Sequence, residues 1–159
     1  AEASGLAPVM VATAEVGDAE MAARVAAHRA ERGAHWGLVE ERFDLVGVLA
    51  REARADRVLV IDCLTLWLSN LMFAERDVET EIEALAAGFA AAAGPVIVVS
   101  NEVGLGIVPE NALARRFRDL QGRANRRLAA VADRVTLVVA GLEMIVRDAP
   151  DPGGASRRS

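Results

Sequence analysis

The chain of 159 residues is 53% hydrophobic with a mean hydropathy of +0.25, enough apolar material for one compact core but short for two domains. Its net charge of −5 disfavours non-specific binding to nucleic acid, because such binding depends on cationic neutralisation of phosphates. No apolar run approaches the roughly 20 residues that cross a bilayer, and the start AEASGLAP lacks the features of a secretory signal, so we expect a cytoplasmic protein.

Residues able to form metal sites or disulfides are few. The single Cys63 excludes an intramolecular disulfide, and one cysteine with two scattered histidines does not supply a closed zinc site. All 18 cationic side chains are arginine, so nothing in this chain can act as the lysine of a phosphate-binding P-loop.

Apolar blocks alternate with helical patterns along the chain, which predicts an α/β fold with a mostly parallel sheet flanked by helices. The predicted strands are residues 8–12, 57–61, 95–99 and 135–140, with 36–40 as a weaker candidate. The predicted helices are residues 18–31, 44–53, 64–73, 79–92 and 111–132. We expect one domain over residues 1–147, followed by a flexible tail, residues 148–159, that is rich in proline, glycine, serine and charge.

Short segments that carry polar side chains follow three of the predicted strands directly. They are Thr13, Ala14 and Glu15; Asp62 and Cys63; and Ser100, Asn101 and Glu102. Parallel α/β sheets bind ligands at the carboxyl ends of their strands, so these residues are the candidate site. An ordinary loop is the competing interpretation, because every strand must end in polar residues somewhere.

Four apolar residues followed by an acid, Val58 to Asp62, match the Walker B pattern of nucleotide-hydrolysing enzymes. In that pattern the carboxylate holds Mg²⁺ beside the nucleotide phosphates, directly or through water. Asp62 could instead cap the helix that follows. Cys63 and Trp67 are expected in the core.

The predicted helix over residues 18–31 carries a histidine among arginines. Spacings of four place Arg24, His28 and Arg32 on one face. Neighbouring guanidinium charges favour a neutral, nucleophilic imidazole and attract the phosphates that it could attack. The alternative is a solvated helix face. His35 is interpreted as a loop or partly packed histidine.

Residues 100–111 (SNEVGLGIVPEN) leave the third apolar block through two glycines and a proline. Gly104 and Gly106 would let this backbone approach a ligand closely. Glu102 could orient water or a metal, or it could be a solvated loop acid. Asn111 is the expected N-cap of the next helix.

Taken together, three segments in this order resemble the bifunctional adenosylcobinamide kinase / adenosylcobinamide-phosphate guanylyltransferase family. They are ATAEVGDAEMAARVAAHR with HWGLVEE after it, then VLVIDCLTLWLSNL, then VSNEVGLGIVPENALARRFRDLQGRANRRLA. The resemblance implies a RecA-like P-loop NTPase fold, phosphorylation of adenosylcobinamide, and transfer of GMP from GTP to adenosylcobinamide phosphate through a histidine. It also implies a homotrimer.

The resemblance assigns roles residue by residue. It places the GMP-accepting histidine at His28 and the Walker B metal ligand, for Mg²⁺, at Asp62. The other implied contacts to GTP or ATP are Ala12, Thr13, Ala14, Arg29, Ala30, Glu31, Arg32 and Glu40. Glu40 also has a chemical reason, since a carboxylate can accept hydrogen bonds from both N1–H and N2–H₂ of guanine.

The sequence departs from the family at its start. Family members open with a strand and a GxxxxGK(S/T) loop that holds the triphosphate. This sequence opens at AEASGLAP, which we interpret as the end of the helix after that loop, and we expect the first strand and P-loop to be missing from it rather than degenerate. The alternatives are a non-catalytic nucleotide-binding or interaction module and a fragment of another RecA-like ATPase.

Overall fold

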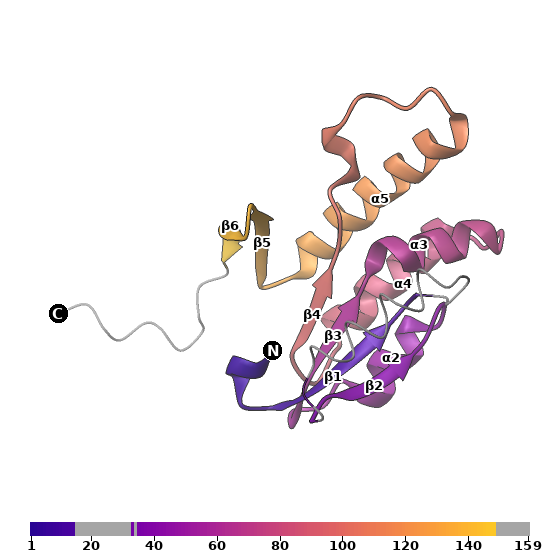
Figure 1. Ribbon diagram of the computed structural model, residues 1–159. Coiled ribbons are helices and arrows are strands. Elements are labelled where there is room, and N and C mark those ends of the chain that lie inside the picture. Colours follow the sequence, from indigo (N-terminus) through magenta and orange to yellow (C-terminus); the bar gives the residue numbers. More distant parts are fainter. Residues whose placement is uncertain (15–32, 34, 149–159) are drawn as a thin grey trace.

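The computed structural model describes residues 1–14, 33 and 35–148. It contains a parallel sheet, four helices and a separate hairpin (Figure 1). The elements in chain order are η1 (Glu2–Ser4), β1 (Ala7–Ala12), β2 (Gly37–Glu40), α2 (Leu45–Glu52), β3 (Arg57–Asp62), α3 (Leu64–Phe73), α4 (Val78–Ala90), β4 (Val96–Val99), η2 (Val103–Leu105), α5 (Ala112–Val131), β5 (Arg134–Val139) and β6 (Leu142–Asp148).

The four strands of the sheet are all parallel and run in the order β2-β1-β3-β4. Ala12 of β1 lies opposite Glu40 of β2 on one side and Asp62 of β3 on the other, and Asp62 in turn lies opposite Val99 of β4. The carboxyl ends of all four strands therefore meet at one edge of the sheet. The fold class predicted from the sequence is confirmed.

One hydrophobic core joins the sheet to the four helices. Val9 and Val11 of β1 and Leu59 and Ile61 of β3 share it with apolar residues of α2, α3, α4 and α5. Trp67 of α3 is fully buried in it. Burial of an aromatic or aliphatic side chain of this size stabilises the fold by about 1.5–3 kcal/mol, so the central strands and α3 anchor the edge that carries the candidate site.

Short polar side chains fix where three of the helices begin. The carboxylate of Asp44 accepts from the Gly47 N–H at the start of α2, and that of Asp77 accepts from the Thr80 N–H at the start of α4. Asn111 accepts from two backbone N–H groups of α5, as predicted. Such side chains satisfy N–H groups that a helix leaves unpaired in its first turn.

The predicted strand over residues 135–140 exists, but its expected place in the parallel sheet is wrong. β5 pairs antiparallel with β6, which was not predicted, across a turn in which Ala140 and Gly141 both have positive φ. Figure 1 shows this hairpin beyond the C-terminal end of α5, apart from the four-stranded sheet. A two-residue turn with positive φ at both positions matches the twist of paired strands, which favours the local hairpin.

Two other predictions meet the limits of the described ranges. The predicted helix over residues 18–31 lies outside them. β6 extends through Asp148, the first residue of the predicted tail, and residues 149–159 lie outside the ranges as well. Within the ranges, no helix combines the length and the apolar character needed to span a bilayer.

Candidate functional site

The carboxyl edge of the sheet brings together residues that are far apart in the sequence. Parallel pairing places Glu40, Ala12 and Asp62 side by side at the ends of three neighbouring strands. The Thr13 N–H donates to the Asp62 carbonyl at 3.1 Å, so the chain leaving β1 stays against β3. Asp62 is partly exposed, Glu40 is exposed, and Ala14 lies in the segment directly after Thr13.

The buried side chain of Thr13 holds the end of β1 to the backbone that follows β3. Its hydroxyl donates to the Cys63 carbonyl and accepts from the Cys63 N–H, both at 2.8 Å, and the residue is fully buried. The hydroxyl therefore holds the backbone that follows Asp62, and its predicted contact with a nucleotide remains a prediction.

Asn70 of α3 connects two of the strand ends and was missed in the sequence. Its Nδ2 donates to the Thr13 carbonyl at 2.9 Å and to the Arg42 carbonyl at 3.3 Å, which ties the end of β1 to the segment after β2. The available signal was one amide side chain among the apolar residues of LTLWLSNLMF. A polar residue inside such a helix needs partners, and these carbonyls supply them.

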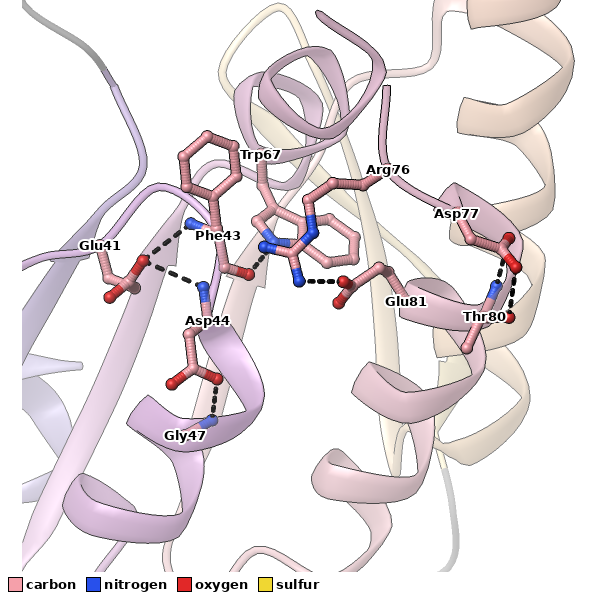
Figure 2. Close-up of polar contacts among 9 residues, drawn as sticks. All are labelled: Glu41, Phe43, Asp44, Gly47, Trp67, Arg76, Asp77, Thr80 and Glu81. Atoms are coloured by element: carbon pink, nitrogen blue, oxygen red, sulfur yellow. Dashed lines mark hydrogen bonds and ion pairs between the residues drawn. The ribbon is translucent and has the colours of Figure 1, made fainter. Parts of the chain in front are cut away.

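The segment after β2 is held by hydrogen bonds to Glu41 (Figure 2). The backbone N–H groups of Phe43 and Asp44 donate to its carboxylate at 2.8 and 3.0 Å, and these bonds lower the pKa of Glu41 below its ordinary value. The Trp67 indole N–H donates to the Phe43 carbonyl at 2.8 Å. The residues after Glu40 are thus fastened to the core.

Two arginines lie over the ring of Phe43. The guanidinium carbons of Arg42 and Arg76 are 5.1 and 5.6 Å from its centroid. Figure 2 shows Arg76 reaching back from the α3–α4 turn toward Phe43, with Glu81 as its ion-pair partner. Cation–π contacts of this kind keep guanidinium groups near the site edge.

The donor set at the edge fits a magnesium ion bound together with nucleotide phosphates. Mg²⁺ is commonly held by one or two carboxylates with water and phosphate oxygens completing its shell, and Asp62 offers one such carboxylate. In the described ranges, no group of three histidine, cysteine or acidic side chains forms a metal cluster. The alternative that Asp62 caps α3 is wrong, because Cys63 occupies the N-cap and no side-chain cap bond forms there.

The predicted nucleophile and its neighbours lie outside the described residues; they are His28, Arg29, Ala30, Glu31 and Arg32. His35 is described, and its Nε2 lies 3.6 Å from the Glu2 carboxylate. Both residues precede the strands β2 and β1, so His35 lies at the amino edge of the sheet, opposite Asp62. This position agrees with its interpretation as a loop histidine.

A polar network continues the edge beyond β4. The Asn125 amide of α5 donates to the Glu102 carboxylate at 2.7 Å and to the Asn101 carbonyl at 3.1 Å. Ser100 bonds to Asn125, and the fully buried Gln121 donates to Ser100 at 2.9 Å. The sequence left the role of Glu102 open between orienting water or a metal and being a solvated loop acid. In the structure, Asn125 of α5 holds its carboxylate in place.

Comparison with known proteins agrees with this architecture. Residues 1–146 match the family described as cobinamide kinase / cobinamide phosphate guanyltransferase. The bifunctional adenosylcobalamin biosynthesis protein CobP of Pseudomonas aeruginosa is 46% identical over 149 residues, which cover 92% of this chain and 86% of that protein. The bifunctional adenosylcobalamin biosynthesis proteins CobU of Salmonella typhimurium and Escherichia coli are 40% and 37% identical, each over 86% of this chain and 84% of theirs.

These matches cover nearly all of the chain and most of each relative. They do not favour the two alternatives, a non-catalytic module or a fragment of another RecA-like ATPase. The chain belongs to the cobinamide kinase / cobinamide phosphate guanyltransferase family, whose members are transferases.

Proposed function

We propose that this chain phosphorylates adenosylcobinamide and transfers GMP from GTP to the resulting phosphate, giving adenosylcobinamide-GDP. The observation that carries the proposal is the shared edge at which Glu40, Ala12 and Asp62 end three adjacent parallel strands. Family membership supplies the reaction class, and this edge is where a doubly wound sheet binds a nucleotide.

Each residue of the edge has a distinct part in the proposal. Asp62 would hold Mg²⁺, which neutralises charge on the transferring phosphates when it is bound. Glu40 would accept from guanine N1–H and N2–H₂, which favours GTP over ATP. Thr13 holds the end of β1 against the end of β3, and Asn70 ties the end of β1 to the segment after β2.

The guanylyl transfer would proceed in two displacements. A ring nitrogen of His28 attacks the α-phosphorus of GTP, a nitrogen–phosphorus bond forms, and pyrophosphate leaves as its bridging bond breaks. An oxygen of adenosylcobinamide phosphate then attacks the same phosphorus, and the imidazole leaves with the pair of electrons that it gave. Splitting one difficult transfer in this way is the general advantage of a covalent intermediate.

Assembly and location complete the proposal. We propose a cytoplasmic location and, by the resemblance alone, a homotrimer. GTP or ATP and the corrinoid are its small-molecule partners, and its acidic net charge suits no nucleic-acid role.

Covalent labelling tests the proposed route. GTP labelled in the α-phosphate should leave an adduct that is stable to base and labile to acid, because an imidazole phosphoramidate hydrolyses once it is protonated. His28→Ala should abolish the label, while His35→Ala, at the other edge of the sheet, should keep it. The same His28→Ala protein should keep more of its phosphorylation of adenosylcobinamide, since direct phosphoryl transfer needs no histidine nucleophile. Label that survives His28→Ala and disappears in His35→Ala would refute the assignment.

A further inference from the structure

A cleft of about 1090 Å³ lies between the N-terminal half of α5, the η2 segment and the α3–α4 turn. We call it the arginine cleft after six of its lining residues: Arg76, Arg115, Arg116, Arg118, Arg123 and Arg126. Its volume lies slightly above the usual range of about 300–1,000 Å³ for small-molecule sites, which suits a bulky ligand. None of the candidate nucleotide residues Ala12, Thr13, Ala14, Glu40 and Asp62 lines it.

The charge of the cleft differs from that of the whole protein. Its six guanidinium groups share the lining with four carboxylates, those of Asp77, Glu79, Glu102 and Asp119. The cleft thus carries an excess of two positive charges in a chain whose net charge is −5. A positive concavity on an acidic protein concentrates anions locally.

Four of the six arginines already have partners within the protein. Arg76 pairs with Glu81, Arg123 pairs with Glu79, Arg118 lies 3.3 Å from Asp119, and Arg115 donates to the Pro109 carbonyl at 2.9 Å.

Arg116 and Arg126, by contrast, form no hydrogen bond or ion pair with any residue in the described ranges, and both are exposed. Helical steps of three and four residues through Asp119 and Arg123 place them along one side of α5. Both guanidinium groups are therefore open to an anion in the same cleft.

The cleft adjoins the candidate nucleotide edge through Glu102. This residue lines the cleft, follows β4 closely, and is held by the Asn125 amide at 2.7 Å. β4 is the strand beside β3, where Val99 lies opposite Asp62. A molecule in the cleft thus lies next to the end of β4, one strand away from the end of β3, which carries the predicted metal ligand.

We propose that the arginine cleft binds the phosphate group of the acceptor in the guanylyl transfer, the phosphorylated corrinoid. Guanidinium groups form paired, charge-assisted hydrogen bonds to phosphate oxygens, and Arg116 and Arg126 are free to form them. The large volume accommodates a bulky acceptor, and Glu102 in the lining shows that one end of the cleft lies next to the end of β4, on the side of the candidate nucleotide edge. The inference rests on the proposed function, because it assigns a site to that reaction's second substrate.

The test compares the double variant Arg116→Gln/Arg126→Gln with Arg134→Gln, an exposed arginine on β5 that does not line the cleft. The measurements are the KM for adenosylcobinamide phosphate in GMP transfer, the KM for adenosylcobinamide in phosphorylation, the KM for GTP, and covalent labelling by GTP. We expect the first KM to rise about tenfold for each arginine lost, since one charge-assisted contact corresponds to roughly that factor. The other three readouts should match those of Arg134→Gln.

The outcomes separate this inference from the function on which it rests. Absence of GMP label in the unmodified protein would refute the proposed histidine route. The cleft assignment would then be refuted with it, because the assigned acceptor belongs to that transfer. Normal labelling with a KM for adenosylcobinamide phosphate within twofold of the control would overturn the cleft assignment alone. An equal rise in KM for both corrinoids, or a rise only for GTP, would also overturn it, because the cleft would not then be reading the acceptor's phosphate.

Discussion

Replacing Thr13 by valine should destabilise the protein strongly, although the two side chains have nearly the same shape. The Thr13 hydroxyl makes two buried hydrogen bonds of 2.8 Å to the N–H and the carbonyl of Cys63. Valine leaves the buried Cys63 N–H without a partner, at about 1–3 kcal/mol, whereas the Cys63 carbonyl still accepts from the Trp67 N–H at 3.2 Å. We expect a loss of about 2 kcal/mol in the free energy of unfolding. At roughly 2–4 °C per kcal/mol for a chain of this size, this lowers Tm by about 6 °C.

Thr13→Ser is the matched control, because serine keeps the hydroxyl and removes only one methyl group. Its expected cost is about 1 kcal/mol, the value of one buried methyl. Urea denaturation followed by the fluorescence of the buried Trp67 gives both free energies on one scale. If Thr13→Val proves as stable as Thr13→Ser, the hydroxyl does not hold the Asp62–Cys63 segment and the account of this edge is wrong.

Two further predictions concern carboxylates near the edge. Asp62→Asn should lower both transfers and weaken their Mg²⁺ dependence while the urea midpoint stays unchanged, because it removes one charged metal ligand; an unchanged rate and Mg²⁺ requirement would contradict its metal role. Glu41→Gln should cost about 1 kcal/mol of stability at neutral pH. The lowered pKa of Glu41 means that its stabilisation is present above the unfolded-state pKa of 4.5 and is lost as pH falls through the folded-state value. The gap between urea midpoints of wild type and Glu41→Gln should therefore close below that pH, and a gap independent of pH would exclude the ionised carboxylate as its cause.

Most helices and strands of the described ranges could be predicted because their signals are local. The apolar blocks of β1 and β3 are buried on both faces of a parallel sheet, so they appear as continuous apolar runs in the sequence. The cap at Asn111 depends on residues within three positions. Each of these features depends only on a short window.

The partner of β5 could not be inferred from its own residues. The run VTLVVA has the composition of a buried strand, yet most of β5 is exposed and pairs only with β6. The signal for the hairpin lay just outside the run, in Gly141 followed by a second apolar stretch. The arrangement of sheet and hairpin is a matter of tertiary packing, which composition alone does not specify.

The candidate site was predictable as a set of strand ends but not as a set of contacts. The sequence pattern indicated parallel strands, which bring their carboxyl ends to one edge, but the strand order that makes Ala12 the neighbour of Glu40 and Asp62 comes from the structure. The hydroxyl of Thr13 and the amide of Asn70 bond across 50 and 57 residues of chain. Such pairings depend on the relative placement of whole elements.

The backbone hydrogen bonds of the β5–β6 hairpin should open more easily than those of the central strands of the sheet. None of its described residues belongs to the core shared by the sheet and helices, and Val138, Leu142 and Val146 expose 63, 75 and 62% of their surface. Its ladder can open without disturbing that core, whereas the amides of β1 and β3 meet solvent only when buried strands separate. In native-state hydrogen exchange, hairpin amides would exchange through local opening and those of the central strands through global unfolding.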